Sequence, residues 1–280
     1  MRYYYRASPP DLSPYVGAFY LMEMPEAAGD LVRVEIPHIR FLCKGISTLS
    51  HGDETRAFDA QEVLVCGPSF RTGSVSVTAG TLILGASLTP LGWYALIGCP
   101  ASDMANRKAG IKTLRPEIDT TSILGVLDSA TSDEELFEAA ETFLRGAVRD
   151  AAPARYDFIK IALDWITDPE SPSVPDLIAR TGLSSRQVDR LCREYFGGSP
   201  KQVHRVFRAL NIAYRLTTEE DTAVQDIAGP YFDQSHLIRD FRDRIGCTPR
   251  EFRQSRVNMM RFDVALRQAI PDLPRYALIG

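Results

Sequence analysis

The sequence predicts an α+β protein of two domains, with a β-barrel or cupin-like sandwich and flanking helices first and an all-α domain second. Short apolar runs separated by Gly, Pro, Asp and Ser occupy 31–90, whereas apolar residues recur at helical spacing beyond 132. A proline among small residues interrupts the helical pattern at 150–154. We therefore place a β-rich domain at 1–152, a helical domain at 153–256 and a C-terminal helical tail at 257–280.

Composition predicts a globular, cytoplasmic chain. The 280 residues are 45% hydrophobic and 24% charged, and the net charge is −4. The start lacks the apolar core of a secretory leader, and no run of 18 apolar residues predicts a membrane span. Five cysteines lie far apart without metal-ligand spacing, which predicts free thiols and no metal site. They are residues 43, 66, 99, 192 and 247.

The N-terminal elements follow from these runs. The predicted strands are 31–36, 39–47, 62–66, 74–78 and 81–89. A short helix is expected just after Pro90. A longer one begins at 132, where Ser132 and Glu135 have the spacing of a capping box and acidic residues suit the positive end of the helix dipole.

The helical domain contains an internal repeat. Residues 184–205 align with 233–254 at a constant offset of 49. Each unit has a helix, a glycine that suits a left-handed C-terminal turn, and a Ser/Thr-Pro pair that begins the next helix. The matched pairs are Val188 with Leu237, Arg190 with Arg239, Arg193 with Arg242, Phe196 with Ile245, Gly197 with Gly246, Ser199 with Thr248, and Pro200 with Pro249.

Both repeated helices are amphipathic in the same way. A helical wheel places apolar residues of each on one side and a polar stripe on the other. The stripes are Arg186, Arg190 and Arg193 in the first helix, and Ser235, Arg239 and Arg242 in the second. One such stripe is usually a solvated face, but its repetition favours a binding surface.

A tight turn precedes the first repeated helix. The segment 175–185 predicts a short helix ended by Gly182 and a new helix capped by Ser184, which is a helix-turn-helix arrangement. Between 178 and 216 there are eight Lys/Arg residues and two acids, a local charge of about +6 that is typical of a phosphate-binding module. The predicted C-terminal fold is therefore an all-α tandem helix-turn-helix.

These units resemble the DNA-binding domain of the AraC/XylS family of bacterial transcription regulators. The most specific segments are GLSSRQVDRLCREYFGGSP and YFDQSHLIRDFRDRIGCTPREFR, and the resemblance spans about 156–254. It implies sequence-specific binding to double-stranded DNA by two recognition helices, 184–195 and 233–244, in successive major-groove segments. It also implies a β-rich sensor or dimerisation domain, a small-molecule effector in that domain, a homodimer, and RNA polymerase as partner of an activator.

The resemblance assigns roles position by position. The base-facing residues would be Arg186, Asp189, Arg190, Gln234, Ser235, Ile238 and Arg239, and the phosphate contacts would be Arg193, His204 and Arg242. Side-chain chemistry agrees, because Arg pairs with guanine, Gln with adenine and Asp with cytosine, and Ile contacts a thymine methyl. Asp189 has the alternative of an ion pair with Arg186 or Arg193 on its own helix. Gly229 and Pro230 depart from the family pattern before the second recognition helix.

An enzyme and an interaction module are the alternatives to a DNA-binding regulator. An enzyme would need a cluster of titratable residues in 1–150, and no catalytic or cofactor-binding motif occurs there. An interaction module would use the arginine stripes to bind an acidic protein. His38 and His51 lack neighbours at ligand spacing, so we expect surface or core histidines. Cys99 is expected to be a buried thiol, with a reactive thiol as the alternative.

Aromatic residues of the N-terminal half suit either a core or a ligand cavity. They are Tyr3, Tyr4, Tyr5, Phe19, Tyr20, Phe41, Trp93 and Tyr94.

Overall fold

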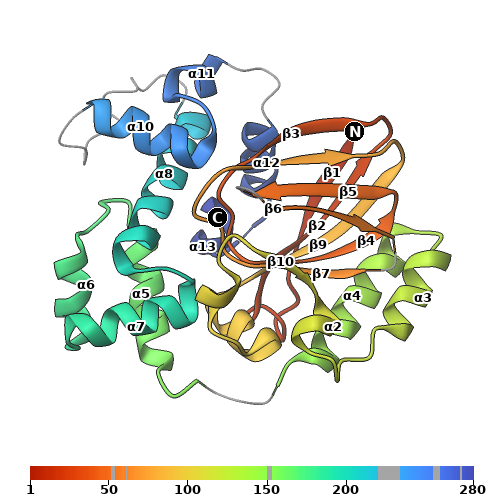
Figure 1. Ribbon diagram of the computed structural model, residues 1–280, viewed down its shortest axis with the longest axis horizontal. Helices are drawn as coiled ribbons and strands as arrows, with labels where there is room; N and C mark the ends of the chain where they lie inside the picture. Colours follow the sequence, from red (N-terminus) through yellow and green to blue (C-terminus); the bar gives the residue numbers. More distant parts are fainter. Residues whose placement is uncertain (52–53, 61, 150–152, 220–233, 255–258, 272) are drawn as a thin grey trace.

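The computed structural model describes residues 1–51, 54–60, 62–149, 153–219, 234–254, 259–271 and 273–280. It has a β-rich N-terminal domain and a helical C-terminal domain side by side, with the C-terminal segment between them (Figure 1). The predicted α+β class is confirmed. No helix within the described ranges is long and apolar enough to cross a membrane.

Within the described residues, ten strands form two separate antiparallel sheets. The larger sheet has, in spatial order, β1 (Arg2–Ala7), β2 (Val16–Met24), β9 (Thr81–Leu88), β4 (His38–Lys44), β7 (Val63–Cys66) and β10 (Lys108–Gly110). The smaller sheet has β3 (Ala28–Val32), β8 (Gly73–Val77), β5 (Ile46–His51) and β6 (Glu54–Asp59). The domain is thus an open two-sheet sandwich and not a closed barrel.

Alternation along the strands builds two cores, because successive side chains of a strand point to opposite faces. On β4, Phe41 belongs to the core that includes the helices, and its ring packs edge-on against Phe143 at 5.6 Å. The next residue, Leu42, belongs to a smaller core with Leu49 and Phe58 of the second sheet. The larger sheet is therefore buried on both faces.

Helices complete the N-terminal domain. They are α1 (Pro90–Gly92), a π-helical turn (Trp93–Ile97), a 3₁₀ turn (Ala101–Met104), α2 (Ile111–Leu114), α3 (Thr121–Ser129) and α4 (Asp133–Ala147). The short helix expected after Pro90 and the long helix expected from 132 are both present. The Ser132 side chain accepts a hydrogen bond from the backbone N–H of Glu135, as the capping motif predicted.

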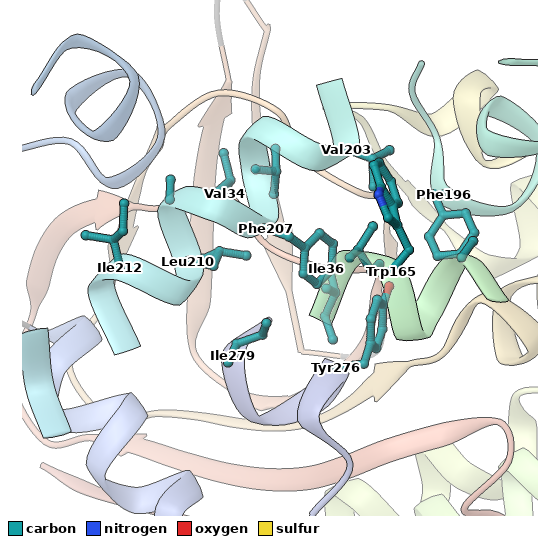
Figure 2. Close-up of a cluster of buried hydrophobic side chains, with 14 of the residues drawn as sticks. Val34, Ile36, Trp165, Phe196, Val203, Phe207, Leu210, Ile212, Tyr276 and Ile279 are labelled. Carbon is teal, nitrogen blue, oxygen red and sulfur yellow. The ribbon is translucent and has the colours of Figure 1, made fainter. Parts of the chain in front are cut away.

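All the regular elements described in the C-terminal half are helices. Its helices are α5 (Tyr156–Thr167), α6 (Val174–Thr181), α7 (Ser185–Phe196), α8 (Pro200–Thr218), α10 (Gln234–Ile245), α11 (Pro249–Gln254), α12 (Met259–Gln268) and α13 (Arg275–Ile279). The long helix α8 runs between α7 and α10 (Figure 1). Its buried residues Val203, Phe207 and Leu210 belong to the core of this half (Figure 2).

The predicted strand 31–36 is only partly correct. Strand β3 ends at Val32, and the following residues leave the sheet. Val34 and Ile36 instead join the core of the helical domain (Figure 2). The Val34 backbone N–H donates to the Arg244 carbonyl oxygen at 2.9 Å. The apolar pattern identified buried residues but not the domain against which they pack.

The C-terminal segment joins both domains. Tyr276 of α13 stacks on Phe207 of α8 with ring centroids 5.4 Å apart. On the opposite side, Ala277 lies against β2 so closely that a Cβ on Gly17 would be 2.5 Å from the Ala277 Cβ. Only a glycine fits at residue 17 without displacement of this contact.

Asp263 of α12 is at the centre of the polar contacts between the β domain and the C-terminal segment. Its buried carboxylate accepts hydrogen bonds from the hydroxyls of Tyr3 (2.6 Å) and Tyr5, and pairs with Arg33 (3.1 Å) and Arg267. Burial alone would raise the pKa of the carboxyl, but the charges of Arg267 and Arg33 hold that pKa well below its ordinary value. Asp263 therefore binds strand β1, the segment after β3 and the C-terminal segment together.

Replacement Asp263→Asn is expected to lower the stability of the folded chain by about 3–5 kcal/mol, because it leaves two buried arginines without their counter-charge. Since the folded-state pKa is depressed, the ionic stabilisation is present above the unfolded-state pKa of about 3.9 and is lost as the pH falls below it. Urea unfolding at pH 7 and at about pH 2 measures both effects. Asp157→Asn, at an exposed i,i+3 ion pair with Lys160, is the control. Equal stability of the Asp263 variant and the control would contradict this role.

Candidate nucleic-acid interface

The first helix-turn-helix unit is built by capping. Helix α6 begins at Ser173 with a capping box and ends at Gly182, which has the left-handed φ of 63°. Helix α7 begins with a second box, in which Ser184 and Gln187 exchange hydrogen bonds, and ends at Gly197 with φ 84°. Left-handed backbone costs glycine little, so both turns are encoded locally.

The second unit repeats this geometry where it is described. Helix α10 is followed by Gly246 with φ 95°. Thr248 then caps α11, because its hydroxyl accepts from the Glu251 N–H at 3.2 Å and its own N–H donates to the Glu251 carboxylate at 2.7 Å. Ser199 and Gln202 make the same reciprocal contacts at the start of α8. The ranges expected for the two recognition helices, 184–195 and 233–244, agree with α7 and α10 to within one residue.

The polar stripe of α7 faces solvent. Val188, Leu191 and Cys192 are buried in the helical core, whereas Arg186, Arg190 and Arg193 are exposed. Asp189 pairs with Arg193 at 2.8 Å, as one of the alternatives from the sequence anticipated. Arg190 pairs with Glu194 at 3.1 Å. Exposed i,i+4 pairs are weak, so these arginines can exchange their carboxylates for another anion.

Helix α10 presents the corresponding stripe. Leu237 and Phe241 are buried, and Ser235, Arg239 and Arg242 are exposed. Ile238 stands on the same outer surface with 38% of its area exposed, one of few large apolar side chains left open to solvent. The side chain of Gln234 and the whole of 220–233, which contains Gly229 and Pro230, lie outside what the structure describes.

Part of the basic charge anticipated for this surface is used inside the protein. Arg205 and Arg208 of α8 both bind the carboxylate of Asp240 on α10, the second at 3.1 Å. Arg244 bonds the Asp240 carbonyl oxygen at 3.1 Å. Although burial of Asp240 would raise the pKa of its carboxyl, these arginines hold that pKa below its ordinary value. The network fixes α10 against α8. The sequence did not predict it because Arg205 and Arg208 lie 35 and 32 residues before Asp240 in the chain.

His204 has a packing role. Its ring stacks on Trp165 with centroids 5.3 Å apart, and its Nε2 lies 3.1 Å from the Ser171 hydroxyl. Burial lowers the pKa of the imidazole, which favours the neutral ring. The ring is half-buried and lies within hydrogen-bonding distance of Ser171, so a contact between His204 and a phosphate would be a hydrogen bond without charge, and it stays a prediction.

Residues 177–255 match a family model described as a helix-turn-helix domain, a range that includes α7, α8, α10 and α11. The match lies within the range, about 156–254, over which the sequence resembles the AraC/XylS family. The chain is a DNA-binding transcription regulator, with the DNA-binding part at its C-terminal side. No match was found among curated proteins.

Solved structures of similar two-domain proteins cover most of the regulator. A structure of ToxT from Vibrio cholerae aligns with a TM-score of 0.47 at 11% identity, covering 84% of this chain and 97% of that one. ToxT bound to an unsaturated fatty acid aligns at 0.46 and 10% identity, covering 83% and 93%. The AraC-like activator CuxR aligns at 0.24 and 12% identity, covering 72% and 83%.

The regulator also has a cavity that sequence reasoning did not locate. It measures about 270 Å³ and is lined by both domains, with Tyr3, Tyr5 and Tyr20 from the β domain and Ile245 from the end of α10. Of the aromatic residues weighed for a cavity, these three line it, whereas Phe19, Phe41 and Trp93 are core residues. Cys99 is half-buried and burial raises the pKa of its thiol, which disfavours the reactive thiolate.

Replacement Asp240→Ala is expected to loosen α10 from α8 by about 2 kcal/mol, because it removes the carboxylate that Arg205 and Arg208 of α8 bind. Hydrogen exchange measures this locally, with roughly thirtyfold faster exchange of α10 amides expected. Amides of α7 should keep their rates. Asp243→Ala, an exposed position on the same helix, is the matched control. Unchanged exchange in α10 would show that the network does not hold the helix.

Proposed function

We propose that the regulator reads two successive major-groove segments of one DNA site, with α7 in the first and α10 in the second. The observation that carries this proposal is the pair of exposed polar stripes at equivalent positions of the repeat. Arg190 and Arg239 are paired by the offset of 49, and so are Arg193 and Arg242. Arg186 in the first turn of α7 and Ser235 in the first turn of α10 are exposed, and recognition helices contact bases through residues at this end.

Helix α8, which connects α7 to α10, supports the same proposal. Helix α8 has 19 residues, so it is about 28 Å long. One turn of B-DNA places equivalent groove positions about 34 Å apart. A rigid connector of this length suits two recognition helices on one face of a duplex.

Within this proposal, Arg186, Asp189, Arg190, Gln234, Ser235, Ile238 and Arg239 face base edges, and Arg193 and Arg242 contact phosphates. Asp189 reads a base only if it releases Arg193, and the weak exposed pair permits that exchange. The exposed Ile238 side chain is suited to a thymine methyl group.

We further propose that a neutral small molecule binds in the cavity between the domains and modulates DNA binding. Three arginines line the cavity (33, 40 and 267), and so do three acids (30, 35 and 263), which balances the formal charge. Arg40 bonds Glu35 at 2.9 Å, and Arg33 and Arg267 bond Asp263. A charged ligand would have to break such a pair, at a cost that a neutral ligand avoids.

The polar anchor of this cavity is His38. Its Nδ1 is buried and has no hydrogen-bond partner among the described residues. Burial lowers the pKa of the ring to about 3, so the imidazole is neutral near pH 7. A cavity of about 150 Å³ accommodates benzene, so about 270 Å³ suits two fused rings. Ile245 and Cys247 in the wall link an occupied cavity to the end of α10.

Selection of bound duplexes from a random library tests the DNA proposal. Arg190→Ala and Arg239→Ala are each expected to lose about 1–3 kcal/mol at one base pair, in the first and second half-site respectively. Arg193→Ala and Arg242→Ala should weaken all sequences alike and lower the salt dependence by about one counterion each. Lys160→Ala on α5 is the control. Equal weakening of every duplex by the Arg190 and Arg239 variants would overturn base reading by these residues.

Calorimetry with 2-naphthamide and its charged counterpart 2-naphthoate tests the cavity. The amide is expected to bind at least about tenfold more tightly, because the carboxylate finds no unpaired cation. His38→Phe should weaken the amide by about tenfold through loss of one hydrogen bond. Glu138→Gln on α4, outside the cavity lining, is the control. Tighter binding of 2-naphthoate, or binding of neither compound, would contradict the proposal.

A further inference from the structure

One short segment of the β domain touches the C-terminal ends of both recognition helices. Residues 68–72 connect β7 to β8. At the first helix, a Cβ on Gly197 would lie 2.3 Å from the Pro68 Cγ, and a Cβ on Gly198 would lie 2.6 Å from the Phe70 Cζ. Both glycines are buried there, so the end of α7 is seated on Pro68 and Phe70.

The second helix ends against the same segment. The Thr72 backbone N–H lies 3.4 Å from the Asp243 carbonyl oxygen. A Cβ on Gly246 would be 2.9 Å from the Leu31 Cδ1 and 3.7 Å from the Thr72 Cγ2. The repeat equivalents Gly197 and Gly246 therefore both contact the β domain, at positions only four residues apart in 68–72.

The segment is itself held firmly. Asn106 donates its N–H to the Pro68 carbonyl oxygen at 2.9 Å and accepts the Phe70 N–H on Oδ1 at 2.7 Å. Ser69 exchanges two hydrogen bonds with Glu35, at 3.0 and 2.7 Å. The backbone of Pro68 and Phe70 is thus bonded to the β domain, while their side chains contact the end of α7. Because four hydrogen bonds hold residues 68–70 in place, the contacts of this segment can fix the positions of the helix ends.

We propose that segment 68–72 sets the separation of the two recognition helices and thereby the spacing of the two DNA half-sites. This inference rests on the proposed reading of DNA by α7 and α10. Helix α8 connects the two units but touches each recognition helix along one side. A further contact at the end of each helix restricts its tilt about α8. Pro68 and Phe70 act as positioning residues, since they lie on the β domain and not on the DNA-facing stripes.

The test uses the full chain and the operator selected above, with the two half-sites separated by the selected spacer or by one or two base pairs more or fewer. Each base pair shifts the second half-site by about 3.4 Å and rotates it, so the wild type is expected to prefer one spacing by about tenfold or more. Pro68→Ala with Phe70→Ala should reduce the preference to about threefold or less. Affinity for an isolated half-site should change by less than about twofold.

Phe70→Leu keeps an apolar contact and is expected to retain an intermediate preference, which separates positioning from loss of folding. Ser76→Ala, exposed on β8, is the matched control. A double variant that keeps the wild-type spacing preference would overturn the inference while leaving the proposed function intact. So would a loss of isolated half-site binding equal to the loss at the full operator. A wild type that selects no two-part operator would instead defeat the proposed function and this inference together.

Discussion

The rest of the structure depends on how α7 and α10 end at their C-termini. Gly197 and Gly246 hold left-handed backbone that ends α7 and α10, and they also permit the β domain to approach. Any Cβ at Gly197 meets Pro68, so the local turn and the domain interface need the same residue type. The helices are thus held at their C-terminal ends, whereas Arg186 and Ser235 in their first turns are exposed.

Two buried carboxylates fix other elements of the structure relative to one another. Asp240 joins α10 to α8, and Asp263 joins α12 to β1 and to Arg33. A buried charge is costly unless it is fully paired, so each carboxylate tolerates few arrangements of its arginine partners. Such sites contribute little net stability compared with apolar packing, but they specify which surfaces meet. Both are linked to α10: Asp240 lies on it, and Arg33, a partner of Asp263, precedes Val34, whose N–H donates to the Arg244 carbonyl oxygen.

The cavity and the segment 68–72 act on different parts of the reading surface. The cavity wall contains the end of α10 but not α7, whereas the segment touches both. An effector in the cavity would therefore alter the position of one helix relative to the other. Coupling of this kind needs only a small displacement, because DNA reading by two helices depends on their separation.

The sequence by itself determined the local and repeated features. The helix caps at Ser184 and Ser199, the glycine turns, the amphipathic faces of α7 and α10 and the family resemblance all follow from residue types at short spacing. Only the tertiary structure decided where Val34 and Ile36 are buried, that Arg205 and Arg208 face Asp240, and that His204 stacks on Trp165. Short-range patterns report which side chains avoid or need water. Partners distant in the chain are selected by packing and by the pairing of buried charges, which no local spacing encodes.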